Sequence, residues 1–339
     1  MTRESESSFR PEVSVIGGSG FIGTRLCELF ERESVSFEIL DLQPSRAFPK
    51  VSRIVDIRNI SAVRAALRGN KIVHLAAVHR DDVRNKSAYY ETNADGTENV
   101  CIVAAEREID TIVFTSTVAV YGFAPADTDE DGAIDPFNDY GKSKFEGELR
   151  LRAWQAAAPD KRRLMIVRPT VVFGEGNRGN VYNLLNAIAS KKFIMIGSGK
   201  NKKSMAYVGN VAAFLSASLK QNRGFSVYNY VDGPDMDMNT LVARARSVLS
   251  GKDDVGVRLP YATAILLARL ADLVSAVSGR TLPVSSIRVK KFVSTTSFSS
   301  AARNMAGFRA PYTLEEGLAR TLDAEFVNPD PDRQIFYTE

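Results

Sequence analysis

Near its N-terminus the chain reads Val13-Ser14-Val15-Ile16-Gly17-Gly18-Ser19-Gly20-Phe21-Ile22-Gly23, which predicts a short buried strand, a glycine turn and the start of a helix. Gly17 permits a positive φ where the strand ends, and Gly20 lets the backbone approach a phosphate closely. Gly23 lets the helix pack tightly on a sheet. The free N–H groups and the positive dipole end of such a helix suit a pyrophosphate. An ordinary glycine turn is the alternative, and the sequence that follows decides between the two.

The acid Asp41 closes the next apolar run, Phe37–Asp41, 18 residues after Gly23. That distance is close to the ~20 residues expected for the carboxylate that accepts hydrogen bonds from an adenosine ribose. A carboxylate there repels a 2′-phosphate, so we expect NAD as the cofactor in preference to NADP. Two alternatives remain: Asp41 could be only a turn residue before Pro44, and Arg46 is near enough to accommodate NADP.

The composition is that of an ordinary globular protein, with 44% hydrophobic and 25% charged residues. The net charge of +4 is mild and dispersed, which argues against nucleic acid as a partner. Cys27 and Cys101 both fall in expected helices, so we expect buried thiols and a cytoplasmic protein. His74 and His79 cannot complete a metal site with cysteines placed elsewhere, so no metal is expected.

Two further segments bear on the location of the protein. Residues 1–10 are polar and predict a flexible tail rather than a signal peptide. The most apolar later segment, 261–277, contains Arg269 and Asp272 and is shorter than the ~20 apolar residues of a membrane span. A buried helix is one interpretation of residues 259–277, and contact with a membrane surface stays open as the other.

Strand-like and helix-like segments alternate through the first half of the chain, which predicts an α/β fold of Rossmann type with a doubly wound parallel sheet. The expected strands are 12–16, 36–41, 52–55, 71–75, 111–116 and 164–168, and the expected helices are 21–32, 60–68, 83–107 and 140–157. We assign residues 11–170 to an NAD-binding domain. Residues 171–330 are expected to form mainly a smaller, mixed α/β substrate-binding region, some segments of which return to the sheet.

The run Tyr140-Gly141-Lys142-Ser143-Lys144 begins an expected helix, in which positions i and i+4 share one face. A lysine ammonium lowers the pKa of a neighbouring phenol from about 10, so Tyr140 can act as an acid or base nearer neutral pH. The preceding strand end, 113–122, is rich in hydroxyl groups. One of these could hydrogen-bond the oxygen with which Tyr140 exchanges a proton, although strand-end hydroxyls often only satisfy backbone groups.

Six motifs in order make the chain resemble the extended short-chain dehydrogenase/reductase superfamily, especially its nucleotide-sugar epimerase, dehydratase and reductase branch. They are Gly17–Gly23, His74-Leu75-Ala76-Ala77, Asn93-x-x-Gly96-Thr97-x-Asn99-Val100, Thr117…Val120-Tyr121-Gly122, Tyr140-x-x-x-Lys144 and Arg168-Pro169…Phe173-Gly174. The resemblance covers about residues 12–330.

The resemblance implies Thr117, Tyr140 and Lys144 as the catalytic set, with Thr117 steadying the substrate oxygen and Lys144 holding the nicotinamide ribose. Asp56 and Ile57 match the pair that contacts the adenine. The residues implied for cofactor binding are Gly17, Gly20, Phe21, Ile22, Gly23, Asp41, Asp56, Ile57, Leu75, Ala76, Ala77, Asn93, Lys144, Pro169 and Val171.

On the substrate side the resemblance is weaker. Asn180 and Val181 match the loop that contacts a nucleoside diphosphate, and Lys203 stands where the family commonly has arginine. Lysine still supplies charge to a diphosphate, but as a point donor without the bidentate fork. His79 and Arg80 are further candidates for substrate contact, as is Thr117. A solvated surface loop is the alternative for the lysine-rich and His79 segments.

The resulting hypothesis is NAD-dependent oxidoreduction at a ring carbon, expected to be C4, of a nucleotide-diphosphate sugar, expected to be UDP-linked, in polysaccharide biosynthesis. A 4-epimerase and a 4-ketoreductase share all of these motifs. Val118 and Ala119 stand where 4,6-dehydratases carry Asp-Glu, which disfavours a dehydratase. A 3β-hydroxysteroid-type dehydrogenase and a non-catalytic NAD-binding scaffold are the alternatives. The helices expected at 83–107 and 140–157 resemble the pair through which relatives dimerise, so we expect a homodimer.

Overall fold

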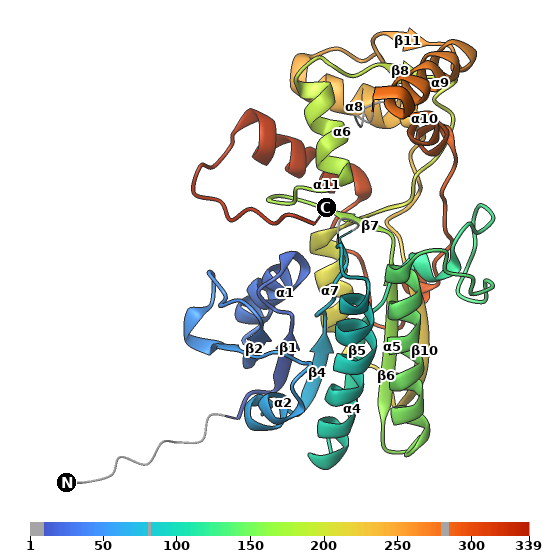
Figure 1. Cartoon of the computed structure of the whole chain (residues 1–339). Coiled ribbons are helices and arrows are strands. Elements are labelled where there is room, and N and C mark those ends of the chain that lie inside the picture. Colours follow the sequence, from blue (N-terminus) through green and yellow to red (C-terminus); the bar gives the residue numbers. More distant parts are fainter. Residues whose placement is uncertain (1–9, 81–82, 279–284, 339) are drawn as a thin grey trace.

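A seven-stranded sheet forms the centre of the computed structural model, which describes residues 10–80, 83–278 and 285–338 (Figure 1). Its strands run in the order β10-β6-β5-β4-β1-β2-β3, and each neighbouring pair is parallel. Their bounds are β1 Val13–Ile16, β2 Phe37–Asp41, β3 Ser52–Ile54, β4 Lys71–His74, β5 Thr111–Thr115, β6 Arg163–Pro169 and β10 Gly224–Tyr230. The doubly wound parallel sheet predicted from the sequence is confirmed.

Alternate side chains of the strands enter two separate hydrophobic cores, one on each face of the sheet. One core joins Val13 and Val15 to the helices α1 (Phe21–Arg32) and α7 (Val208–Ser218). The other joins Ile16 to α2 (Ile60–Ala66), α4 (Gly96–Glu106) and α5 (Asp139–Ala156). Cys27 and Cys101 are buried free thiols, one in each core. Because both faces are covered, the strands read as nearly continuous apolar runs.

The strand order reverses between β1 and β4, which lie side by side in the middle of the sheet. In doubly wound sheets the ligand crevice opens beyond the carboxyl ends of the strands at such a reversal. Here that point is occupied by the glycine turn after β1 and by the small residues after β4. The topology alone therefore positions the two motifs predicted to hold the cofactor.

The single helix predicted over 83–107 is divided into three parts. A short α3 (Ser87–Tyr90) is followed by a π-helical turn, η2 (Glu91–Asp95), and then by α4. The helix begins at Ser87, later than predicted, after a turn in which the Asn85 side chain accepts a hydrogen bond from the N–H of Ser87 at 3.2 Å. The π-turn contains the buried Asn93, a common place for a functional side chain.

The region after residue 170 is mixed, as predicted, and it contains its own core. Two small two-stranded sheets pair β7 (Val171–Phe173) with β9 (Met205–Tyr207) and β8 (Met195–Ile196) with β11 (Arg258–Leu259). The helices are α6 Asn180–Ala189, α8 Met238–Ser250, α9 Tyr261–Ser278, α10 Ser286–Val293 and α11 Leu314–Leu322. Meanwhile α7 and β10 return to the Rossmann sheet.

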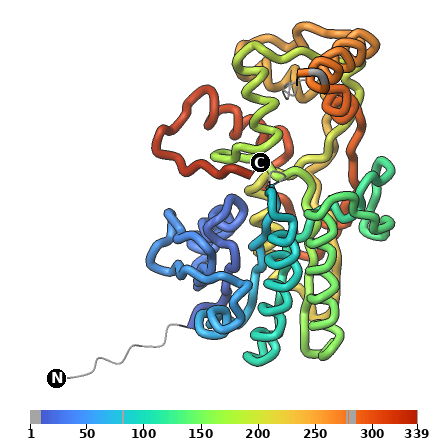
Figure 2. The backbone as a smooth tube through the Cα atoms, in the orientation of Figure 1, coloured from blue at the N-terminus to red at the C-terminus, as the bar shows by residue number. Residues whose placement is uncertain are grey.

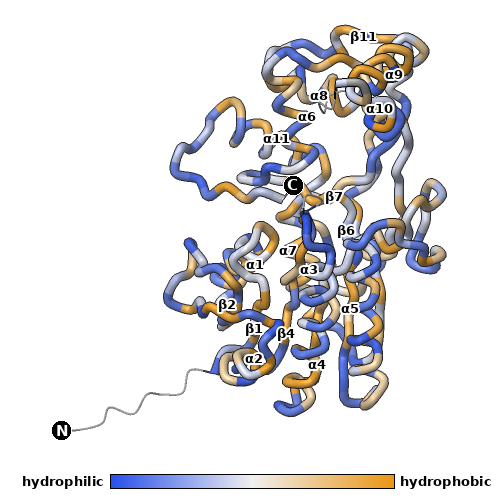
Figure 3. Tube along the Cα trace, viewed as in Figure 1, coloured by the Kyte–Doolittle hydropathy of each residue, from blue (hydrophilic) through white to orange (hydrophobic). Residues whose placement is uncertain are grey.

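At its periphery the molecule has two further features. The C-terminal segment returns to the middle of the molecule, where the N–H of Phe336 donates to the carbonyl of Gly176 at 2.8 Å (Figure 2). The helix α9 lies at the outer end of the C-terminal region and is strongly hydrophobic (Figure 3). Among the described helices, none has the length and apolar content that a membrane span requires. The predicted flexible tail, 1–10, lies almost wholly outside the described residues.

His74 at the end of β4 is fully buried between the strand and α4. Its Nε2 lies 3.0 Å from the Thr97 hydroxyl, which itself donates to the carbonyl of Asn93. The Nε2 therefore carries the proton and donates to Thr97. Burial, with a smaller contribution from Lys144, lowers the pKa of His74 to about 3.

We expect the substitution His74→Gln to make the unfolding free energy depend less steeply on pH below about pH 6.5. The unfolded chain binds a proton on this imidazole below about pH 6.5, whereas the folded chain does not bind it until about pH 3. Between those values wild type should lose ~1.4 kcal/mol of unfolding free energy per pH unit more than the variant. Urea denaturation at pH 4–7 measures the difference, and parallel profiles would contradict a neutral buried imidazole.

Candidate active site

The glycine turn after β1 has the geometry that the sequence predicts. Gly17 adopts a φ of +80°, and a Cβ there would lie 2.5 Å from the backbone nitrogen of Ala76. A Cβ on Gly23 would lie 2.5 Å from the Cα of Gly18, so the helix packs directly on the turn. A Cβ on Gly20 would meet only the carbonyl of Gly17, at 3.4 Å. The space in front of Gly20 is therefore open, whereas the other two glycines are closely packed.

Helix α1 begins at this open position and provides an anion site. Gly20 is its N-cap, and among the described residues no side chain caps this end of the helix. The first N–H groups of the helix, at Phe21 and Ile22, therefore face the open space with the positive end of the helix dipole. This arrangement fits the pyrophosphate of a dinucleotide.

Two carboxylates carry the predicted contacts to the adenosine, Asp41 at the glycine turn and Asp56 after β3. Asp41 accepts hydrogen bonds from the N–H of Ser19 at 2.9 Å and from the N–H of Gln43 at 3.2 Å, which fixes it beside the glycine turn. Asp56 forms an ion pair with Arg58, N–O distance 2.7 Å, and this hydrogen-bonded guanidinium lowers the pKa of the Asp56 carboxyl. Ile57 is buried beneath the first turn of α4. The ribose and adenine contacts of these residues stay predictions.

The loop after β4 closes the other side of the crevice. The N–H groups of Leu75 and Ala76 both donate to the carbonyl of Ile16, at 2.7 and 3.1 Å, which continues the pairing of the two strands. Asn93 then clamps the loop, because its side chain donates to the carbonyl of Val78 at 2.9 Å and accepts from the same residue's N–H at 2.8 Å. The half-buried Leu75, Ala76 and Ala77 leave a flat surface at the strand end.

The three residues predicted to be catalytic lie at the carboxyl end of β5. Thr117 follows that strand and caps the short helix η3 (Val118–Tyr121), with its Oγ1 accepting from the N–H of Ala119 at 3.1 Å. Tyr140 lies in the first turn of α5, whose N-cap is Asn138. A Cβ on Gly141 would lie 2.6 Å from the carbonyl of Ala119, so α5 packs directly against the Thr117 segment.

Lys144 is one turn further along α5 and is almost completely buried, with 1% of its surface exposed. Its Nζ lies 4.0 Å from the centre of the Phe114 ring, a cation–π contact with β5. Burial lowers the pKa of Lys144 to about 7, although the carboxylate of Glu148 acts in the opposite direction. The amine therefore changes its charge near neutral pH, on the same helix face as the phenol of Tyr140.

A buried ion pair lies beneath this set. Glu148, one turn after Lys144, is completely buried and receives two hydrogen bonds from the Arg168 guanidinium, at 2.6 and 2.9 Å. The Ser116 hydroxyl donates to the same carboxylate at 2.6 Å. Desolvation acts to lower the pKa of Arg168, but hydrogen bonding and charge from Glu148 outweigh it, and the pKa of Arg168 is raised. With Ser116, the pair joins α5 and β6 to the segment between β5 and Thr117.

The network continues across the sheet to β10. Arg168 donates to the Tyr121 hydroxyl at 2.8 Å, and Tyr121 in turn donates to the Asn229 side chain at 2.8 Å. Asn229 Nδ2 donates to the carbonyl of Ser299 at 3.0 Å, and so reaches the segment beyond α10. A continuous set of hydrogen bonds therefore runs from Glu148 on α5, through Arg168 and Tyr121, to Asn229 on β10 and the carbonyl of Ser299.

The predicted substrate contacts fall in three different environments. Lys203 is half-buried, and its Nζ donates to the carbonyl of Lys291 at 3.0 Å and to the Thr296 hydroxyl at 3.1 Å. Burial lowers the pKa of Lys203. Asn180 is exposed at the start of α6, whereas the Val181 side chain is buried in the C-terminal core.

The remaining predicted contacts lie nearer the sheet. His79 and Arg80 are exposed in the loop after β4. Pro169 ends β6 and Val171, partly exposed, begins β7, so both lie beyond the carboxyl edge of the sheet. This is the edge on which the residues predicted to bind the cofactor are placed.

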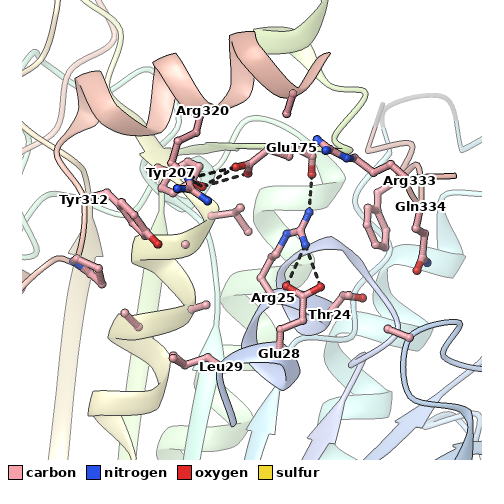
Figure 4. A pocket seen from close by; sticks show the side chains of 18 of the residues that line it. Thr24, Arg25, Glu28, Leu29, Glu175, Tyr207, Tyr312, Arg320, Arg333 and Gln334 are labelled. Carbon is pink, nitrogen blue, oxygen red and sulfur yellow. Dashed lines mark hydrogen bonds and ion pairs between the residues drawn. The ribbon is translucent and has the colours of Figure 1, made fainter. Parts of the chain in front are cut away.

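A separate cavity of about 1050 Å³ opens between α1, α7 and α11 (Figure 4). The Arg25 guanidinium crosses it, donating to the Glu28 carboxylate at 2.9 Å and to the carbonyl of Glu175 at 3.0 Å. The Tyr207 hydroxyl donates to the Glu175 carboxylate at 2.9 Å and accepts from Arg320 at 3.1 Å. The three catalytic candidates do not line this cavity, and Arg25, Glu175 and Arg320 in its wall are held by the contacts just named.

The fold and the site together define an oxidoreductase of the extended short-chain dehydrogenase/reductase class. Residues 13–230 match the family described as the NAD dependent epimerase/dehydratase family. The chain is 47% identical over 329 residues to an N-acetyl-alpha-D-glucosaminyl-diphospho-ditrans,octacis-undecaprenol 4-epimerase of Escherichia coli O157:H7, covering 96% of this chain and 99% of the relative. The chain belongs to the NAD dependent epimerase/dehydratase family, and its cofactor is NAD.

Solved structures agree on the fold. The UDP-glucose 4-epimerase of Thermus thermophilus, in complex with NAD, superposes with a TM-score of 0.71 at 20% identity, covering 94% of this chain and 99% of that one. The UDP-N-acetylglucosamine 4-epimerase of Bacillus cereus gives a TM-score of 0.71 at 16% identity, covering 96% and 99%. The Rossmann-type architecture predicted from the sequence is therefore shared with 4-epimerases of known structure.

Sequence reasoning missed the residues behind the site. Glu148 stands four residues after Lys144 and eight after Tyr140, so helical spacing places all three along one face. That spacing was the available signal for Glu148. Asn229 gave no comparable signal, because it reaches Tyr121 only through the pairing of β10 with β6.

The substitution Gly20→Ala tests the pyrophosphate cradle without disturbing the fold. Gly20 has an ordinary φ of −77°, and a Cβ there has room within the protein, so we expect unfolding free energy to change by less than about 0.5 kcal/mol. The added methyl group occupies the phosphate position, and NAD should bind about tenfold more weakly or worse. Isothermal titration calorimetry with NAD measures the loss.

Gly251→Ala is the matched control for that experiment. Gly251 ends α8 with a φ of +67°, and nothing lies within 4 Å of its added Cβ. This variant should lose about 1 kcal/mol of stability from backbone strain and keep its NAD affinity. Unchanged NAD binding in the Gly20→Ala variant would contradict the proposed cradle.

Removal of one partner of the buried Glu148–Arg168 ion pair should lower the stability of the fold strongly. In Glu148→Gln the Arg168 guanidinium stays buried opposite a neutral amide, and we expect a loss of about 3–5 kcal/mol in unfolding free energy. Glu106→Gln, which breaks an exposed pair with Arg64, is the control and should leave the urea midpoint unchanged. Equal effects of the two substitutions would show that the buried pair contributes no more than a surface one.

Proposed function

We propose that the protein is an NAD-dependent 4-epimerase of a sugar, most specifically an N-acetylhexosamine, that is linked through a diphosphate to a polyprenol. One observation carries this proposal: the near end-to-end 47% identity to the Escherichia coli enzyme named for that reaction. The complete Thr117, Tyr140 and Lys144 set at the end of β5 supports catalysis rather than a scaffold role.

In this proposal the side chains of the site handle the proton of the C4 hydroxyl. The Tyr140 phenolate accepts that proton as the hydroxyl carbon is oxidised and returns it when the carbon is reduced. The Thr117 hydroxyl donates a hydrogen bond to the same sugar oxygen and keeps it aligned. Lys144, held against Phe114, stabilises the phenolate when its amine is protonated.

When bound beside this set, NAD would supply reversible hydride transfer at C4. Inversion requires that the 4-keto sugar presents its other face before the hydride comes back, so no net oxidant or reductant is consumed. A 4-ketoreductase, the other enzyme that the motifs allow, consumes one equivalent of NADH per product. Cofactor balance therefore separates the two activities directly.

We further propose that Lys203 provides the charge for the diphosphate, with Asn180 as a polar contact at the start of α6. Both a nucleotide and a polyprenol would present the same diphosphate to these groups. The UDP-linked sugar expected from the motifs thus remains the second candidate substrate.

A homodimer through α4 and α5, in the cytoplasm, is also part of this proposal. Ile102 on α4 and Leu149 on α5 are apolar side chains with nearly half of their surface exposed. The two helices lie side by side on the outer face of the Rossmann domain (Figure 1). Such a pair suits the four-helix contact that the sequence resemblance implies.

The substitution Tyr140→Phe tests the reaction. We expect purified protein with NAD to convert N-acetylglucosaminyl-diphospho-polyprenol to its C4 epimer without net change in absorbance at 340 nm. Loss of the phenol should lower turnover by about 10²–10⁴-fold, the usual contribution of a positioned acid–base group. Tyr337→Phe, at an exposed tyrosine, is the control and should keep full activity.

The same assay with UDP-N-acetylglucosamine decides between the two carriers. Faster conversion of the UDP-linked sugar would overturn the polyprenol part of the proposal and leave the 4-epimerase part standing. Stoichiometric loss of NADH with a 4-keto sugar, and no epimer from either hydroxylated sugar, would establish the ketoreductase instead.

A further inference from the structure

The helix α9 turns its small apolar residues toward the protein and its large apolar residues toward the solvent, which is the reverse of an ordinary surface helix. Ala264 and Ala268 face inward and pack with Val289 of α10. The outer side carries larger apolar side chains, each with 52–62% of its surface exposed. These are Leu266, Leu267, Leu270, Leu273 and Val274. A soluble helix normally turns its large apolar residues toward the core, so an exposed stripe of this kind marks an interaction site.

The exposed residues form one continuous face. Their spacing, at i, i+1, i+4, i+7 and i+8, is that of a single side of an α-helix. The inner side is fixed by α10, because the N–H of Ser286 donates to the Asp272 carboxylate at 3.1 Å. Ile287, in the first turn of α10, adds a further exposed apolar side chain. We call Leu266, Leu267, Leu270, Leu273, Val274 and Ile287 the α9 face.

Cationic side chains accompany the α9 face. Arg269 is exposed on α9, and Lys290 and Lys291 are exposed on α10, three and four residues after Ile287. Ile287 and the two lysines therefore share one side of α10. An apolar face with cations beside it is the pattern of helices that lie in the interface of an anionic bilayer. The finding that no described helix can span a membrane agrees with surface binding.

The α9 face is tied physically to the proposed diphosphate site. The Lys203 ammonium donates to the carbonyl of Lys291, and the Asn201 side chain donates to the carbonyl of Phe292 at 2.8 Å. The last turn of α10 is thus anchored to the loop that bears Lys203. A substrate whose diphosphate lies beside Lys203 would have its lipid chain beginning next to α10 and α9.

We propose that the α9 face docks on an anionic phospholipid bilayer, with α9 lying along the membrane surface, so that the site meets its lipid-linked diphosphate substrate there. This inference rests on the proposed polyprenol-linked substrate. The face lies at the opposite end of the molecule from the α4–α5 surface proposed for dimerisation, so a dimer leaves it accessible (Figure 1). The lysines beside the face and its link to Lys203 favour a lipid surface over a second copy of the chain as the occupant.

Vesicle co-sedimentation of the full chain tests the proposal. We expect wild type to bind phosphatidylcholine vesicles containing about a third phosphatidylglycerol, and to bind pure phosphatidylcholine more weakly. Leu270→Gln combined with Leu273→Gln should weaken binding about tenfold or more. Ile54→Gln combined with Val248→Gln, at exposed apolar residues outside the α9 face, is the matched control and should bind as wild type does.

A second double variant separates the contribution of charge to vesicle binding from the contribution of apolar burial. Lys290→Gln combined with Lys291→Gln should remove most of the preference for the anionic vesicles and lower the sensitivity of binding to salt. Failure of wild type to sediment with anionic vesicles at low salt, or equal binding by the two apolar double variants, overturns the proposal. A third result would also overturn it. If wild type does not bind vesicles, and light scattering shows that the Leu270→Gln and Leu273→Gln variant has half the mass of wild type, the α9 face is a contact between two copies of the chain.

Activity in the absence of a membrane distinguishes this inference from the proposed function. The Leu270→Gln and Leu273→Gln variant should epimerise a short-chain, water-soluble polyprenyl-diphospho-sugar at the wild-type rate, and lose rate only when the substrate is embedded in vesicles. Equal loss on both substrates overturns a docking role. Vesicle binding without epimerase activity on either substrate would leave the docking surface standing and remove the proposed reaction.

Discussion

The ion pair between Glu148 and Arg168 is the interaction on which the candidate site depends. Both side chains are almost completely buried, and the desolvation of two charges is recovered only when each is fully hydrogen-bonded. Here Glu148 accepts hydrogen bonds from Arg168 and Ser116, and Arg168 also donates a hydrogen bond to the Tyr121 hydroxyl. These partners lie on α5, β6 and the segment after β5. The buried ion pair tolerates little displacement, so it fixes the relative positions of these three segments.

The placement of Lys144 follows from that pair. Lys144 and Glu148 are one turn apart on α5, so the helix cannot rotate to expose the amine without moving the buried carboxylate. The amine is instead held against the Phe114 ring, where burial lowers its pKa and the charge of Glu148 opposes that shift. A lysine that titrates near neutrality is thereby kept beside the residue predicted to exchange the substrate proton. The neutral His74 next to the same ring adds no competing charge.

Local signals in the sequence were sufficient for the Rossmann half of the molecule. Glycine spacing, apolar runs and the acid at Asp41 each depend on neighbours within a few tens of residues, and the strands and helices lie within a few residues of their predicted bounds. The π-turn around Asn93 was not predicted; η2 packs there against α5, so closely that a Cβ on Gly147 would clash with the Asn93 carbonyl oxygen, and periodicity does not register such a contact. The strand β10 and its Asn229 depend on contacts about 60 to 110 residues away along the chain, with β6 and Tyr121, which periodicity does not register.

The Rossmann half and the C-terminal region have different roles in the proposed function, and this difference bears on which carrier the enzyme accepts. The reaction that we propose needs only a hydroxyl, a phenol and a cofactor at the end of β5, whereas the diphosphate and its carrier are proposed to lie beside Lys203. In this proposal discrimination between carriers comes from the region beside Lys203, which the last turn of α10 contacts and which α9 adjoins through α10. In this chain those helices turn leucines outward beside lysines, whereas a nucleotide carrier would need polar and stacking groups. A common reaction centre can thus serve different carriers, because the surface that meets the carrier lies outside the hydrogen-bonded network that fixes the reaction centre.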